Sequence, residues 1–88
     1  MEEKLAEVIR QTELDLRNAE VSLADYALDL AGDLVVMATA IRRGQAKETI
    51  KLSGIVQGQG TTIDGLCARC YTLQLTLDRL KAMEGSQQ

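Results

Sequence analysis

The sequence has no histidine, tryptophan or phenylalanine, and it has only two cysteines. Without histidine, general acid–base catalysis would have to use carboxylates or the cysteines, and no convergent pair of such groups is evident. The Glu-x-x-His motif of ferritin-like di-iron proteins is excluded as well. We therefore predict a protein that is not an enzyme and that has no metal ion and no cofactor.

A chain of 88 residues fits one domain. A chain this short buries only about 60 to 65% of the surface that it exposes when unfolded. Small domains usually gain the missing stability from disulfides, metals or partner chains. Because the sequence has only two cysteines for disulfides and no histidine to bind a metal, we expect a homo-oligomer.

The net charge of −3 argues against a nucleic-acid partner, because nucleic-acid surfaces need clustered lysine and arginine. Residues 1–33 hold nine acids and three bases, whereas residues 34–58 hold four bases and one acid. This asymmetry could orient antiparallel chains, or it could be a solvated helix face without a role. A third interpretation is that the acidic face mimics a nucleic-acid backbone and blocks a basic groove.

No secretory signal is evident, since the amino terminus is acidic and lacks a continuous apolar region. The most hydrophobic stretch, residues 21–41, is interrupted by Asp25, Asp29 and Asp33, which makes membrane insertion unfavourable. We therefore expect a cytoplasmic protein without a membrane partner. We interpret the three aspartates as a solvated strip, with a divalent-ion site as the alternative.

The amino-terminal half carries an apolar stripe at helical spacing, which predicts one helix from about residue 3 to residue 43. Arg42, Arg43 and Gly44 suit its carboxyl end. A break near Ser22 is the alternative. Such a helix is about 60 Å long, so one subunit cannot cover it. The stripe comprises Leu5, Val8, Ile9, Thr12, Leu16, Ala19, Leu23, Tyr26, Ala27, Leu30, Leu34, Met37 and Ile41.

A second apolar stripe begins at Val21, and its alanines permit close approach of another helix. It comprises Val21, Ala24, Leu28, Ala31, Val35 and Ala38. The helix should therefore need one neighbour in its first half and two neighbours in its second half.

Residues 44–60 are expected to form a connector, with a short helix at 46–53 or an extended segment at 49–52, and with a flexible joint at the glycines of residues 57–60. A last helix is expected from about residue 62 to residue 84, capped by Thr61. Its apolar positions follow the four-three spacing of a coiled coil. They are Ile63, Leu66, Cys70, Leu73, Leu77 and Leu80.

These elements predict an all-α protein in which the long helix and the carboxyl-terminal helix form a helical hairpin within a single domain, residues 1–88. A second subunit then completes a four-helix bundle or coiled coil, most simply as a dimer. The residues expected at this oligomer interface are Leu23, Tyr26, Leu28, Leu30, Leu34, Val35, Met37, Ile41, Leu66, Cys70, Leu73, Leu77 and Leu80.

Two motifs have chemical alternatives. Cys67 and Cys70 face the same way on a helix, and we interpret them as buried thiols, with an interchain disulfide, a shared metal site or a redox pair as alternatives. The Gly-rich joint before Thr61 could bind an anion at a helix amino terminus, although the Walker pattern is absent and a hinge is the simpler interpretation. The residues of this possible ligand site are Arg42, Arg43, Lys51, Gly58, Gly60, Thr61 and Thr62.

For function, we expect a non-catalytic protein–protein interaction module, such as an adaptor, an assembly factor or an inhibitor. It would act as a helical homo-oligomer that binds another protein. The alternative is a helical oligomer that binds a small ligand or a nucleotide through the basic connector and the Gly-rich hinge.

Overall fold

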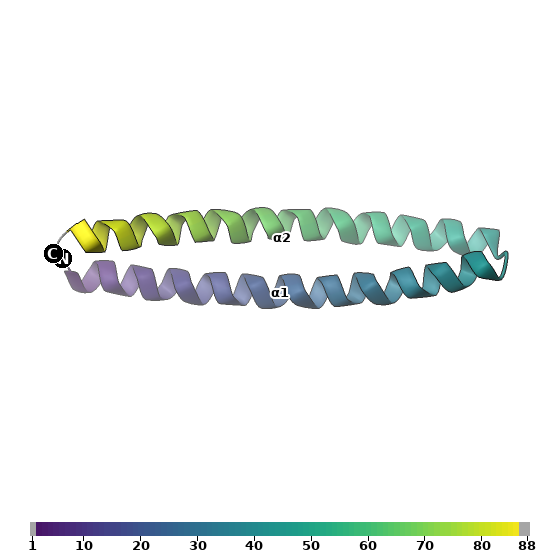
Figure 1. The fold of residues 1–88 in the computed structure, drawn as a ribbon, viewed down its shortest axis with the longest axis horizontal. Coiled ribbons are helices and arrows are strands. Elements are labelled where there is room, and N and C mark those ends of the chain that lie inside the picture. The colour runs from purple at the N-terminus through teal and green to yellow at the C-terminus, as the bar shows by residue number, and fades with distance from the viewer. Residues whose placement is uncertain (1, 87–88) are drawn as a thin grey trace.

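The protein is a hairpin of two long helices, shown by a computed structural model that describes residues 2–86. Helix α1 spans Glu2–Arg42 and helix α2 spans Ala46–Ser86, with 41 residues in each. They run antiparallel side by side over their whole length (Figure 1). The rod measures 65 × 14 × 14 Å and has a radius of gyration of 19.5 Å, whereas a compact chain of this length has about 12 Å. The predicted all-α hairpin is confirmed.

Helix α1 begins and ends within one residue of the predicted bounds, and it continues through Ser22 without a break. It ends in a Schellman motif around Gly44, whose φ of 69° is the left-handed conformation that glycine adopts at little cost. The Gly44 N–H donates to the Ile41 carbonyl and the Gln45 N–H donates to the Ala40 carbonyl, both at 3.0 Å. These bonds reverse the chain within three residues.

The connector predicted at 44–60 is wrong, because α2 begins at Ala46 and runs unbroken through its glycines; the short helix expected at 46–53 is the first part of α2. The helix predicted from residue 62 is therefore only the second part of α2. Thr61 is not a cap, since its hydroxyl donates to the Gln57 carbonyl inside the helix. A glycine costs a helix about 1 kcal/mol relative to alanine. Packing of this stretch against α1 outweighs that cost, because its inward positions continue the coiled-coil spacing.

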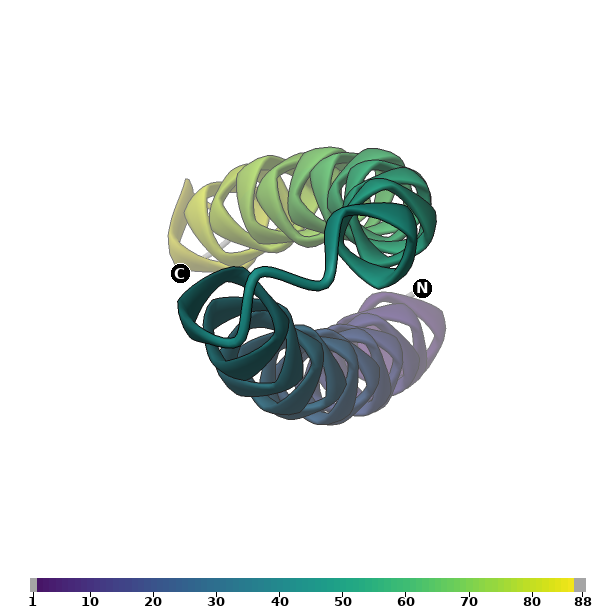
Figure 2. The same ribbon diagram turned by 90° about the vertical axis from the view of Figure 1, so that its right-hand side faces the viewer.

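The two helices meet along a seam whose positions alternate between spacings of three and four residues. Heptad spacing of this kind makes two helices wrap around each other in the left-handed sense, as the view along the rod shows (Figure 2). The seam of α1 comprises Leu5, Ile9, Thr12, Leu16, Ala19, Leu23, Leu30, Asp33, Met37 and Ala40. The seam of α2 comprises Thr49, Leu52, Val56, Gln59, Ile63, Leu66, Cys70, Leu73, Leu77 and Leu80.

The seam corrects the predicted stripe of α1 in its second half. Leu34 and Ile41 are exposed, and the inward positions belong to Asp33 and Ala40 instead. A straight helix drifts by about 20° per heptad relative to a supercoiled one. The drift from Leu5 to Asp33 therefore amounts to about 80°. Because neighbouring residues on a helix are about 100° apart, a straight-helix period assigns the inward position to Leu34 instead of Asp33.

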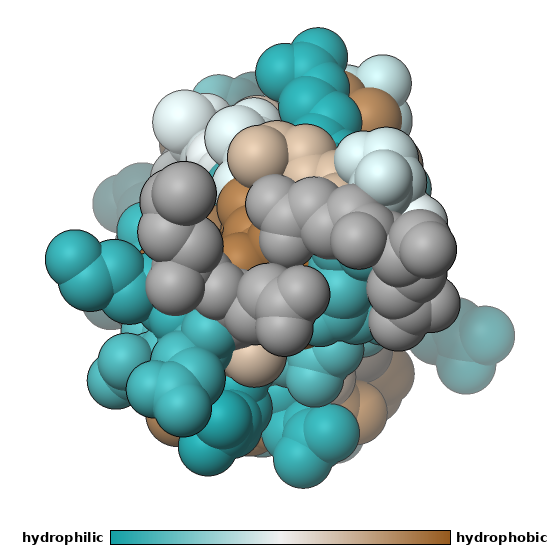
Figure 3. All heavy atoms as spheres, turned by 90° about the vertical axis from the view of Figure 1, so that its left-hand side faces the viewer, coloured by the Kyte–Doolittle hydropathy of each residue, from teal (hydrophilic) through white to brown (hydrophobic). Residues whose placement is uncertain are grey.

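Packing is tighter in the half of the rod that contains the start of α1 and the end of α2. We call this half, residues 2–20 and 72–86, the terminal half, and residues 21–71 the loop half. Ile9, Leu16 and Leu77 form the core cluster, together with Leu5, Leu73 and Leu80 and with Cys70 just inside the loop half. Apolar atoms are visible between the helices at this pole of the rod (Figure 3). In the loop half, the buried apolar residues are Ala40 and Leu52.

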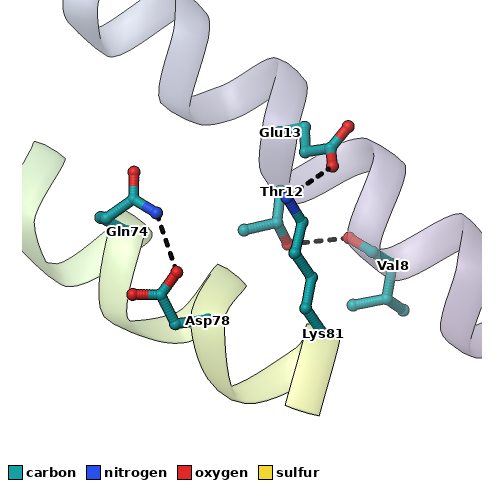
Figure 4. A network of polar contacts seen from close by, with 6 residues as sticks. All are labelled: Val8, Thr12, Glu13, Gln74, Asp78 and Lys81. Carbon is teal, nitrogen blue, oxygen red and sulfur yellow. Dashed lines mark hydrogen bonds and ion pairs between the residues drawn. The ribbon is translucent and has the colours of Figure 1, made fainter. Parts of the chain in front are cut away.

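Polar contacts reinforce the terminal half. The Lys81 ammonium of α2 lies 3.4 Å from the Glu13 carboxylate of α1 and bridges the helices, while the buried Thr12 hydroxyl donates to the Val8 carbonyl one turn earlier (Figure 4). An exposed ion pair of this kind contributes about 0 to 1 kcal/mol. The apolar cluster, and not the ion pair, therefore dominates the stability of this half.

The hairpin exposes more surface than a compact protein of its mass. Its accessible surface is 6652 Å². A compact monomer of this mass exposes about 5,100 Å², so the excess is about 1,500 Å². Within residues 2–86, neither helix contains a stretch apolar enough to cross a membrane.

Candidate interaction surface

Helix α1 presents a second apolar surface that α2 does not cover, and we call it the α1 face. It consists of three rows of residues, each with a spacing of seven, and every member is exposed. The rows are Val21, Leu28 and Val35; Ala24, Ala31 and Ala38; and Ala27, Leu34 and Ile41. The seven-residue spacing matches that of the seam, so the face keeps a constant orientation relative to α2 along the supercoil.

Exposure in the α1 face is large and contiguous. Leu28 is 72% exposed and Val35 is 67% exposed. Single exposed apolar residues are normal on a soluble protein, but contiguous patches usually mark interaction sites. At 1.5 Å per residue, the face extends for about 30 Å along α1, which is long enough to pack against several turns of another helix.

The α1 face adjoins the part of the seam that is least buried. Leu23, Leu30 and Met37 contact α2 from the seam but remain partly exposed. Each adjoins the uncovered rows, so a helix placed on the α1 face would also shield these seam side chains. The loop half is therefore the part of the rod in which a further helix adds the most burial.

The border of the α1 face is acidic. Asp25 is exposed beside the row of Val21, Leu28 and Val35, whereas Asp29 is exposed farther round α1, in the same row as Val36. Asp33 instead lies in the seam, where its Oδ2 accepts a hydrogen bond of 2.6 Å from Nε2 of Gln59. The three aspartates therefore do not act as one solvated strip. Among residues 2–86, no group of three or more acidic or cysteine side chains is arranged to hold a metal ion.

The residues predicted at the oligomer interface fall into two groups. Eight of them lie in the seam of the hairpin itself: Leu23, Leu30, Met37, Leu66, Cys70, Leu73, Leu77 and Leu80. The other five are exposed: Tyr26, Leu28, Leu34, Val35 and Ile41. Four of these five belong to the α1 face, while Tyr26 occupies a seam position without being buried by α2.

The residues of the predicted ligand site are not brought together. Arg42, Arg43 and Lys51 lie near the loop, whereas Gly58 to Thr62 lie inside α2, beginning about 18 Å along the helix from its start. The Thr62 hydroxyl donates to the Gly58 carbonyl at 3.3 Å. The anion-site hypothesis required a helix amino terminus with free backbone N–H groups at Thr61. No such terminus exists there, because these residues lie inside α2.

The actual start of α2 lies beside a shallow depression at the loop. Ile41 of the α1 face and Ile50 of α2 line it together with the chain reversal. The full lining is Ile41, Gly44, Gln45, Ala46, Thr49 and Ile50. The depression is open and mostly apolar, so it extends the α1 face across the loop and does not form a separate polar pocket.

The two cysteines have different surroundings. Cys70 is partly buried in the seam and packs against the core cluster, whereas Cys67 is exposed, and both are free. The interpretation as two buried thiols is therefore wrong for Cys67.

No protein-family model, curated protein or solved structure matches the chain. Its function must accordingly be inferred from its own surface.

Proposed function

We propose that the protein is a non-catalytic protein–protein interaction module that acts as a helical homo-oligomer in the role of an adaptor, an assembly factor or an inhibitor. The observation that carries this proposal is the α1 face, a contiguous apolar surface on residues 21–41 that the hairpin leaves uncovered. Removing apolar surface from water stabilises a complex by roughly 25 cal/mol per Å². Helix packing is the natural use of this face.

Other classes of partner fit the α1 face less well. An amphipathic helix that binds an anionic membrane or a nucleic acid carries lysine and arginine beside its apolar face. Here the border holds Asp25, and Glu20 is exposed at the start of the row of Ala27 and Leu34. These carboxylates would repel phosphates. A protein helix is favoured instead.

The surface of the hairpin is less suited to the alternative, a helical oligomer that binds a small ligand. The residues of that predicted site lie in two separate places, and the depression at the loop is open and apolar. Small-molecule sites are usually concave, with a few converging polar groups. The hairpin offers a long convex surface, which suits a macromolecular partner.

Co-purification from the native host tests the proposal. Two variants carry the same substitution, valine to aspartate, at adjacent residues. Val35→Asp places a carboxylate in the α1 face, whereas Val36→Asp places it on the other side of α1, where Val36 is 51% exposed. We expect wild type and Val36→Asp to recover the same second protein, and we expect Val35→Asp to lose it because the carboxylate disrupts the homo-oligomer that binds that protein. Equal recovery by both variants, or recovery of no second protein by wild type, would contradict the proposed role.

A further inference from the structure

We infer that the occupant of the α1 face is a second copy of this chain, with α1 packed antiparallel against α1 and with the two-fold axis at Ala31. This inference rests on the proposed function, because it names the partner of the same surface. It also specifies a stagger: only the loop halves overlap, and the terminal halves project in opposite directions.

The first argument is the symmetry of the α1 face about Ala31. Three of the four pairs of residues equally distant from Ala31 match in size: Ala24 with Ala38, Leu28 with Leu34, and Val21 with Ile41, whereas Ala27 is smaller than its counterpart Val35. An isologous dimer requires such self-complementarity, because one surface patch meets its own copy after a two-fold rotation. A partner with another sequence would place no such requirement on the face. The nearly palindromic pattern therefore favours a second copy.

The second argument is the shape of the face. Its central row consists of alanines, which allow two helix axes to approach closely. Larger side chains flank this row on both sides, and every one of them is exposed in the single hairpin. In the antiparallel pair, Leu28 comes level with the partner's Leu34 and Val35. Small residues thus meet at the centre, while large residues interlock at the borders.

The third argument is charge. Antiparallel pairing about Ala31 brings the exposed Arg42 of one copy level with the partner's Glu20, and this happens twice in the dimer. Parallel pairing would instead place like charges at the same level, since residues 1–33 have six more acids than bases. Like charges in register are unfavourable and select against that arrangement. The charge pattern therefore favours the antiparallel orientation.

The fourth argument is area. A standard protein–protein interface buries about 800 Å² on each partner. The hairpin exposes about 1,500 Å² more than a compact monomer of its mass, so one such interface fits within the excess. The α1 face lies entirely in the loop half. The terminal half already has its own packed cluster and needs no second copy.

The stagger gives the dimer a characteristic length. From Ala31 back to the start of α1 at Glu2, the helix extends for about 45 Å. Two hairpins that overlap at Ala31 therefore reach about 90 Å end to end, compared with 65 Å for one hairpin. A dimer with full overlap would keep nearly the length of one hairpin, so small-angle X-ray scattering separates the two arrangements.

Site-specific crosslinking tests the orientation, in a chain that also carries Cys67→Ser and Cys70→Ala. In the proposed dimer, Ala24 lies opposite the partner's Ala38, whereas the two copies of Ala24 are about 20 Å apart. Disulfides need Cα atoms closer than about 7 Å. We expect an A24C chain refolded with an A38C chain to form a disulfide-linked heterodimer on oxidation, and neither chain alone to crosslink.

Light scattering tests the copy number, with circular dichroism as the check on folding. We expect twice the chain mass of 9.6 kDa. Val35→Asp should lower the association constant at least about 100-fold, because it places a carboxylate in the apolar interface twice. Val36→Asp should change it less than about threefold, as expected of an exposed position outside the interface.

Three results would overturn the inference: crosslinking of A24C with itself, no crosslinking of the mixture, or a monomeric mass for wild type. A monomer that still recovers a second protein through Val35 would overturn the pairing alone. A dimer that recovers no second protein would overturn the adaptor role alone. The two proposals therefore fail separately.

Discussion

Asp33 and Gln59 are polar side chains at seam positions that apolar residues usually occupy, and a hydrogen bond joins them across the seam. Both are partly buried, and Oε1 of Gln59 is buried without a hydrogen-bond partner. Polar pairs at such positions fix the register of a coiled coil at a cost in stability. We therefore expect the double variant Asp33→Leu/Gln59→Leu to be more stable than the wild type.

The magnitude follows from three contributions. Two leucines at half-buried positions together contribute about 1.5 to 3 kcal/mol. Removing the unpaired Oε1 of Gln59 contributes about 1 kcal/mol or more, and losing a hydrogen bond to a carboxylate costs about 1.5 to 3 kcal/mol. The double variant should therefore unfold with a free energy about 1 kcal/mol higher than wild type, within the range of these terms.

The single variants should behave differently. Asp33→Leu leaves the Gln59 amide without its partner, and Gln59→Leu leaves the Asp33 carboxylate without its donor, so each should lower the free energy of unfolding by about 1 to 2 kcal/mol. Urea denaturation of all four proteins at one fixed chain concentration, followed by circular dichroism, measures the cycle. Additive single and double effects, or a double variant less stable than wild type, would refute the reasoning.

Three further changes test the packing of the hairpin by thermal and urea denaturation. Leu77→Ala should lower the free energy of unfolding by about 2 to 4 kcal/mol, because Leu77 is 5% exposed in the core cluster; a loss under 1 kcal/mol would mean that the terminal half is not the main core. Gly65→Ala should raise it by about 1 kcal/mol, since an added Cβ meets no atom within 4 Å; destabilisation would point to an interface there. Gly44→Ala should lower it by about 1 to 2 kcal/mol, because the φ of Gly44 is 69°; an unchanged midpoint would show that the loop relaxes freely.

The sequence was sufficient to predict α1 and its end. An apolar stripe that keeps its helical period from Leu5 to Ile41 favours one helix, and Gly44 after two arginines marks where the helix stops. The same reasoning failed for α2, where glycines between residues 54 and 60 suggested a joint. Local propensity was overruled there by the heptad spacing that continues from Thr49 to Leu80, and following that spacing would have found the helix.

The candidate surface was predicted in part. The stripe that begins at Val21 is the core of the α1 face, and its six residues are all exposed in the hairpin. Leu34 and Ile41 were assigned to the wrong stripe, because a straight-helix period ignores supercoiling. The bond from Gln59 to Asp33 was missed, since Gln59 was placed in a connector and Asp33 on a polar strip. Only the fold brings these two residues together.

The start of α1 and the end of α2 lie at the same pole of the rod, and this determines how the hairpin responds to mechanical load. A force applied across those two ends peels α1 from α2 one layer at a time, starting at the core cluster around Ile9 and Leu77. The strongest layers are therefore loaded first, and the loosely packed loop half carries the load only after they have separated. Such an arrangement yields in a single step once its threshold is passed. A second copy clamped on the loop half would add a second threshold.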